Sequence, residues 1–298
     1  MAVVSGAVAA LAWPALGRAE PVAEATPPPE ATAPVPAARA SRVPAEQPAA
    51  HRRRFYVDFG GALVKPVSSS RELELADVEG PASLAVQNGP IKGSGATVGS
   101  ALIPAGSIGW VLPWWKSRRV SAELVFGLPF KVTFEATGTL ANMSIAPTAL
   151  GIPTGVPALG PRLGEAMATP VVVTTVYQLI DHGVLRPYLG AGASVLFASQ
   201  AKVTNPTLTE VSRPEMSISP APGLVLQGGL EARLSDRIFA RFDVKFIALM
   251  LARAQVHHIE VNTPDIPLFG NVEVGTAKMD VWVNPLIVHA GIGFDFDL

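Results

Sequence analysis

The stretch that decides the fold is the C-terminal one, TAKMDVWVNPLIVHAGIGFDFDL, residues 276–298. From Leu286 onward the even positions are apolar, while the odd positions carry polar or small residues such as His289 and Asp295. This two-residue alternation is typical of a strand with one apolar face. Before Pro285 the apolar residues stand at odd positions instead. Because proline cannot donate to a ladder, the sequence predicts a β-bulge at Pro285.

A long terminal strand with aromatic residues on its apolar face is typical of the closing strand of a transmembrane β-barrel, whose outward face meets lipid. The alternative is a long edge strand of a soluble β-sandwich. The composition favours the membrane, because 49% of the 298 residues are hydrophobic and only 16% are charged, against about 25% charged in an average soluble domain. After the first twenty positions there is no apolar run long enough for a spanning helix, which leaves a closed barrel as the way to cross a bilayer.

The N-terminal part divides into two segments by composition. Residues 1–19 form a short apolar run with small residues before a cleavage point at Glu20, which predicts a signal peptide without a positive n-region. A buried N-terminal helix is the alternative, and Pro14 disfavours it. Residues 20–54 predict a disordered Ala/Pro-rich periplasmic linker. Its basic end, residues 51–54, either contacts lipid phosphates or is simply solvated, and peptidoglycan is a candidate partner of the linker.

The remainder, residues 55–298, divides into eight strand-like segments. They are 55–64, a second that ends at Trp115, 119–134, 169–180, 185–198, 223–234, 237–251 and the C-terminal stretch. Short connections alternate with long ones at 67–94, 138–168, 200–221 and 258–275. This alternation predicts an all-β fold, an eight-stranded antiparallel transmembrane β-barrel with short periplasmic turns and long outer loops. Such a barrel has an interior that is filled by side chains or holds a small ligand.

Four segments carry a family resemblance: AELVFGLPFK, TPVVVTTVYQL, LRPYLGAGASVLF and DVWVNPLIVHAGIGFDF. In this order and spacing, over residues 55–298, the chain resembles the OmpW family of small outer-membrane barrels. The resemblance implies the outer membrane of a Gram-negative bacterium and the passage or binding of small hydrophobic molecules through a narrow, partly apolar lumen with a lateral exit. The chain departs from the family in its N-terminal extension, in the long segment 138–168 and in its terminal Leu298. The alternative is a non-conducting structural or adhesive envelope protein that uses the barrel as an anchor.

The alternation also assigns charged side chains to the lumen. They are Asp58, Glu123, Arg186, Glu231, Arg233, Arg241, Asp243 and Lys245. Because an unpaired buried charge is costly, these groups should pair across the barrel, either as a structural plug or as a gate that opens.

Nearer the outer end, the same phasing turns four apolar side chains inward: Leu196, Val225, Leu249 and Trp282. They would line an apolar vestibule for a ligand, although a packed core would have the same pattern. Pro129 and Pro285 each remove a ladder donor, so we expect a lateral opening near their levels.

Other classes of function find little support. A net charge of −1 offers no basic surface for nucleic acid, and without cysteine there is no disulfide or thiolate metal site. His257 and His258 are adjacent and would point to opposite faces of a strand, which disfavours a metal site. No serine or carboxylate has a spacing that pairs it with a histidine on one face, so we expect no enzyme and no cofactor. The expected partners are outer-membrane lipids and small hydrophobic molecules.

Overall fold

The structure, a computed structural model, describes residues 54–113, 119–266, 268 and 270–296. The predicted signal peptide and all but the last residue of the predicted linker lie outside the described residues. No helix among the described residues is long and apolar enough to cross a membrane.

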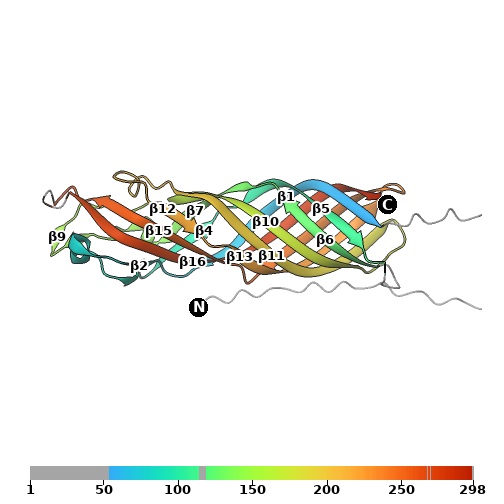
Figure 1. The fold of residues 1–298 in the computed structure, drawn as a ribbon, viewed down its shortest axis with the longest axis horizontal. Helices are drawn as coiled ribbons and strands as arrows, with labels where there is room; N and C mark the ends of the chain where they lie inside the picture. The colour runs from blue at the N-terminus through green and yellow to red at the C-terminus, as the bar shows by residue number, and fades with distance from the viewer. Residues whose placement is uncertain (1–53, 114–118, 267, 269, 297–298) are drawn as a thin grey trace, which may run out of the picture. The chain divides into compact units, whose positions relative to one another are not determined.

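Eight long antiparallel strands build the molecule, four of them in two parts (Figure 1). In chain order they are β1 (Phe55–Ser70), β4 (Ser94–Val98) with β5 (Ala101–Val111), β6 (Val120–Gly127) with β7 (Phe130–Gly138), β10 (Arg162–Gln178), β11 (Leu185–Val203), β12 (Glu215–Ile218) with β13 (Ala221–Arg233), β14 (Ile238–Ala248) with β15 (Leu251–Asn262), and β16 (Asn271–Phe296). The pairing runs β1–β5–β6–β10–β11–β13–β14–β16 and returns to β1. Since the last strand pairs with the first, no strand of this ring is left with an open edge, and the predicted eight-stranded barrel is confirmed.

The short connections lie at the end of the barrel where β1 begins and β16 ends (Figure 1). One of them, between β10 and β11, is held by Asp181, which accepts hydrogen bonds from Arg119 at 3.0 and 3.1 Å. The neighbouring His182 Nδ1 lies 3.1 Å from the same carboxylate. The long connections all lie at the opposite, outer end, in the alternation that the sequence predicts.

These long connections form an outer extension of the barrel wall in place of open loops. They contain β2 (Glu74–Ala76), η1 (Gly80–Leu84), β3 (Gly89–Pro90), α1 (Thr139–Asn142), β8 (Thr148–Ala149) and β9 (Ile152–Pro153). Leu75, Leu140, Val156 and Leu208 are buried there in one apolar cluster. The extension therefore has a core of its own, because outside the bilayer the apolar side chains gain by turning inward.

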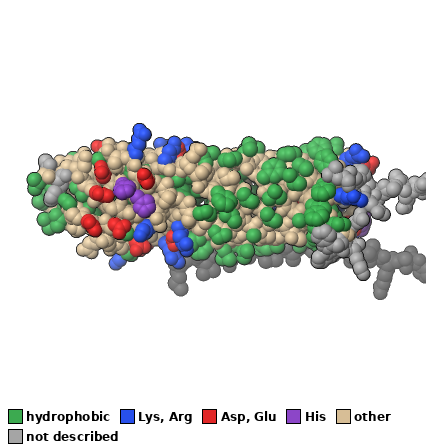
Figure 2. Space-filling model, viewed as in Figure 1, with side chains coloured by type: hydrophobic (Ala, Val, Ile, Leu, Met, Phe, Trp, Pro, Cys, Tyr) green, Lys and Arg blue, Asp and Glu red, His purple; other side chains and the backbone are tan. Residues whose placement is uncertain are grey.

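Within the membrane the polarity is reversed. Outward side chains such as Leu124, Phe242 and Ile292 are apolar and more than two fifths exposed. Figure 2 shows apolar side chains gathered around the part of the barrel nearer the short turns, and most charged side chains over the outer part. An apolar band of this kind is the surface that meets lipid.

The structure corrects the predicted bulge at Pro285. The register between β1 and β16 is continuous through Pro66↔Pro285, and the odd positions of β16 face inward on both sides of it. The shift lies in the partner strand, between Phe246↔Leu286 and Leu251↔Trp282. What changes at Pro285 is the surrounding medium. Below it lipid selects apolar residues for the outward face, and above it water selects them for the inward face.

Candidate functional site

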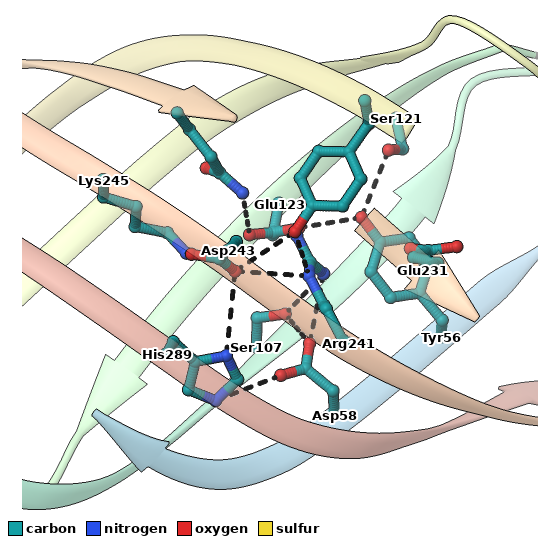
Figure 3. A network of polar contacts seen from close by, with 12 residues as sticks. Tyr56, Asp58, Ser107, Ser121, Glu123, Glu231, Arg241, Asp243, Lys245 and His289 are labelled. Atoms are coloured by element: carbon teal, nitrogen blue, oxygen red, sulfur yellow. Dashed lines mark hydrogen bonds and ion pairs between the residues drawn. The ribbon is translucent and has the colours of Figure 1, made fainter. Parts of the chain in front are cut away.

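A buried network of charged side chains fills the lumen at the level of the membrane, with Arg241 of β14 at its centre (Figure 3). Its guanidinium lies 3.2 Å from Asp58 of β1, 2.6 Å from Glu123 of β6 and 3.3 Å from Asp243. The Lys245 ammonium lies 2.5 Å from the other oxygen of Asp243. Three carboxylates and two cations from three strands therefore meet in one buried cluster.

Hydroxyl, amide and imidazole groups complete this network. Arg241 Nε donates to the Tyr188 hydroxyl at 2.7 Å, and the Tyr56 hydroxyl donates to Glu123 at 2.9 Å. His289 of β16 lies between two carboxylates, with Nε2 3.6 Å from Asp58 and Nδ1 3.7 Å from Asp243. Ser107 donates to Asp58, and Gln227 donates to Glu123 at 3.3 Å. The Ser121 hydroxyl lies 3.2 Å from the Tyr56 hydroxyl. Because the members of the network come from seven of the eight strands of the ring, the network ties together most of the barrel wall.

Glycines on the inward faces make room for the aromatic rings of this region. A Cβ on each would lie 1.8 to 2.4 Å from the nearest ring or hydroxyl atom of its neighbour; the pairs are Gly109 with Tyr56, Gly229 with Tyr188, and Gly293 with Phe239. Real Cβ atoms essentially never come that close. The small inward residues of the strands therefore reflect tight packing of the lumen, as expected for eight strands.

An apolar cavity of about 100 Å³ lies directly outside the network. Asp58, Asp243, Lys245 and His289 form its floor. Its walls are apolar and include Ala62, Ile103, Val125, Phe130, Val172, Leu196, Ile247, Val283 and Ile287. A second apolar cavity of about 80 Å³ follows in the outer extension, lined by residues such as Leu75, Phe134 and Met279. The lumen is thus polar at the membrane level and apolar above it.

The barrel wall beside the first cavity is interrupted. The register of β5 with β6 ends at Ala105↔Gly127, and beyond it the Leu128 amide reaches the Pro104 carbonyl only at 3.5 Å. On the other side, the partners of β10 pass from Ala168↔Phe130 to Val171↔Phe126 with a shift of one residue. This break in strand pairing surrounds Pro129, one of the two positions near which the sequence predicts a lateral opening; at the other, Pro285, the pairing with β1 is continuous.

Three comparisons place this barrel among known proteins. The model of the OmpW family matches residues 114–296. The chain belongs to the OmpW family. The uncharacterized outer-membrane protein y4mB of Sinorhizobium fredii is 26% identical over 207 residues, which is 69% of this chain and 71% of that protein. The crystal structure of OprG from Pseudomonas aeruginosa shares the fold, with a TM-score of 0.62 and 18% identity over 83% of this chain and 97% of OprG. The E. coli outer membrane protein W aligns with a TM-score of 0.40 and 14% identity, over 82% and 98% of the two chains. The OmpW-family barrel described here is thus an outer-membrane protein of a Gram-negative bacterium.

The charged residues that the sequence assigns to the lumen separate into two groups in this OmpW-family barrel. Asp58, Glu123, Arg241, Asp243 and Lys245 are the charged members of the network and are almost fully buried.

The other group, Arg186, Glu231 and Arg233, lies nearer the periplasmic end. Arg186 stands opposite Glu231 in the register, and its side chain donates to the Gly183 carbonyl at 3.3 Å. Glu231 accepts a hydrogen bond from Gln178 at 3.1 Å, and Arg233 forms an ion pair with Asp295.

Two of the four residues assigned to the vestibule are in fact on the outer surface. Leu196 lines the first cavity, and Val225 is buried in the apolar core. Leu249 is 63% exposed, because its φ of +61° places it in the bulge between β14 and β15, and the bulge reverses the facing. Trp282 stands between the buried Val281 and Val283 and therefore faces outward, because the apolar phase of β16 belongs to the interior at this level.

Other members of the site were missed, although the strand period could have found several. Tyr56, Tyr188 and His289 all stand on inward faces, and only their residue types kept them from being counted among the charged groups. The expectation for the histidine pair also needs correction. Val256 and Ile259 both pack in the apolar cluster, and His258 has a φ of +55°. This bulge leaves both histidines on the outer surface and not on opposite faces. Among the described residues, no cluster of three or more His, Asp or Glu side chains could hold a metal ion.

Proposed function

We propose that this OmpW-family barrel binds small apolar molecules in the cavity above the charged network and releases them sideways into the membrane. The observation that carries this proposal is the position of the cavity. Its floor is the ion-paired network, whereas its lining includes Gly106 and the outward-facing Phe126 at the interrupted wall. An apolar molecule in the cavity therefore has a charged barrier below it and an interrupted sheet beside it.

The energetics favour the lateral route. Movement toward the periplasm would separate Arg241 from its carboxylates, and breaking a buried ion pair costs about 3–5 kcal/mol. Movement sideways would meet few ladder hydrogen bonds, because the β5–β6 register ends at Ala105↔Gly127. Pro104, Pro129 and Pro170 lie around this gap and have no N–H to donate. The lateral route therefore leaves the network intact.

The cavity sets the size of the molecule. An engineered apolar cavity of about 150 Å³ binds benzene, so a cavity of about 100 Å³ suits a molecule of that order once a few side chains shift. The second cavity, of about 80 Å³, would be the preceding position on the way in from outside. The substrate class is thus small, uncharged and apolar.

Uptake of a fluorescent apolar probe by cells tests this proposal. Ala105→Trp places a large ring in the cavity beside the interrupted wall, and we expect it to reduce uptake to the level of cells that lack the protein. Leu249→Asp is the matched control, since Leu249 is on the outer surface and its positive φ suits aspartate. We expect it to leave uptake unchanged. If both folded variants transport like the wild type, the cavity is packing only, and the barrel is better described as a non-conducting anchor for its outer extension.

A further inference from the structure

Two lysines share one glutamate on the outer surface, across three neighbouring strands. Lys131 of β7 and Lys202 of β11 both contact Glu165 of β10, which stands between them. The Lys202 ammonium lies 2.7 Å from Oε1, and the Lys131 ammonium contacts Oε2. The lysine side chains are 58% and 65% exposed, whereas that of Glu165 is only 17% exposed. The carboxylate thus lies beneath two ammonium groups that face the solvent.

This lysine clamp, Lys131, Glu165 and Lys202, carries an excess positive charge. One carboxylate balances only one of the two ammonium groups, and hydrogen bonds from both lysines hold the pKa of Glu165 below its ordinary value. Each ammonium has three donors and uses one of them on Glu165. The nearby Arg162 and Glu135 stand opposite each other in the register, so they add no net charge. The clamp therefore offers two adjacent cationic groups with free donors.

The clamp lies at the outer edge of the lipid-facing band. On the membrane side of the clamp, the nearest exposed large apolar side chains are those of Leu128, Val171 and Phe197. They lie three, six and five positions from Lys131, Glu165 and Lys202, and the outward positions between them carry Met167, Thr169 and Ser199. Strands rise about 3.3 Å per residue, so the ammonium groups reach the level where the headgroups of the outer leaflet begin. Beside the clamp is a groove of about 460 Å³, lined by Lys131, Thr133, Arg162, Glu165 and Thr204 among others. The groove also holds the hydroxyl groups of Thr133 and Thr204 and the opposite charges of Arg162 and Glu135.

We propose that the lysine clamp binds the phosphate group of an outer-leaflet lipid, whose headgroup occupies the groove. A phosphate matches the clamp because it accepts hydrogen bonds from several donors at once and neutralises the excess charge. The depth matches as well, since the acyl chains of such a lipid would lie along Leu128, Val171 and Phe197. The bound lipid would stand beside the wall segment that is interrupted at Pro129.

Native mass spectrometry tests the proposal. The full-length protein is released from nanodiscs of neutral phosphatidylcholine that also contain lipid A, and the lipid that remains bound is identified. We expect the wild type to retain lipid A and Lys131→Gln/Lys202→Gln to bind it about tenfold or more weakly, since each lysine near a lipid phosphate is worth about 1 kcal/mol. Dephosphorylated lipid A should not be retained by either protein. Retention of the dephosphorylated lipid, or displacement of lipid A by inorganic phosphate alone, would overturn the assignment to a lipid phosphate.

Two further variants separate the clamp from net charge and from folding. Arg71→Gln/Arg253→Gln is the matched control, because these arginines also flank one carboxylate, that of Asp280, but at 3.7 and 3.9 Å. It should keep wild-type binding, and an equal loss in both double variants means that only net charge matters. Glu165→Gln frees both lysines and should bind lipid A as tightly as the wild type or more tightly. The heat-induced gel mobility shift reports whether the barrel is folded. If Glu165→Gln keeps this shift but no longer binds lipid A, the three residues are only a structural ion pair.

Discussion

Replacing Arg241 by alanine tests the reasoning about the lumen most directly. The guanidinium lies within 3.3 Å of three carboxylates, on Asp58, Glu123 and Asp243, and is almost fully buried. Removing it leaves three carboxylates with the single cation of Lys245. Truncating one partner of a buried ion pair typically costs about 3–5 kcal/mol, because the remaining charge stays buried without compensation. The several hydrogen bonds of Arg241 are not additive, so we expect the loss of unfolding free energy to lie within this range.

The assay is urea unfolding of the barrel refolded into lipid vesicles, followed by tryptophan fluorescence and by gel mobility. Arg119→Ala is the control, because Arg119 also pairs with a carboxylate but at the surface of a periplasmic turn. Exposed pairs contribute little, so the control should unfold almost like the wild type. Equal losses for the two variants would show that the lumen network is solvated and does not act as a plug. The Arg241 variant should also raise single-channel ion conductance, and an unchanged conductance would place the barrier elsewhere.

Three further predictions follow from the facing of individual residues. Leu124→Arg, on the outward face, should cost about 2–4 kcal/mol at the bilayer midplane, whereas Thr133→Arg in the outer extension should unfold in urea like the wild type. Gly109→Ala should destabilise the barrel by about 1–3 kcal/mol through overpacking, because a Cβ there would lie 1.8 Å from the ring of Tyr56. Gly61→Ala is its control, since a Cβ there meets nothing within 4 Å, and its urea unfolding should match that of the wild type. The pKa of Asp181 is lowered from 3.8 to about 2 by hydrogen bonds from the neighbouring histidine and then from the arginine of the turn. A lowered carboxylate pKa stabilises the fold above the unfolded value, so the contribution of Asp181 is present above pH 4 and is lost between about pH 4 and 2; acid unfolding curves of Asp181→Asn should lack this component.

The lumen shows how far residue patterns reach. Arg241, Asp243 and Lys245 alternate along β14, so their common inward facing follows from the period of a strand. The partner of Arg241 does not follow, because Glu123 is 118 positions away in the chain and meets it only after the barrel has closed. The sequence therefore predicts that the charges pair but not which carboxylate each cation contacts. The interrupted wall is only partly predictable from the sequence. Pro129 marks its place, but strand pairing is what brings Pro104 and Pro170 next to it.

By itself the sequence determined the eight strands, their order and the facing of every membrane-level segment, because a bilayer demands an apolar residue at every second position and that demand is local. Only the tertiary structure decided the facing above the membrane. There water replaces lipid outside the wall, so the apolar residues of the alternating pattern face inward instead of outward. The pattern, when it is interpreted as lipid-facing, therefore predicts the wrong face for Trp282. The strand period predicts that Leu249 faces inward, but a bulge of one residue turns it outward. A bulge depends on the partner strand rather than on any period in the chain.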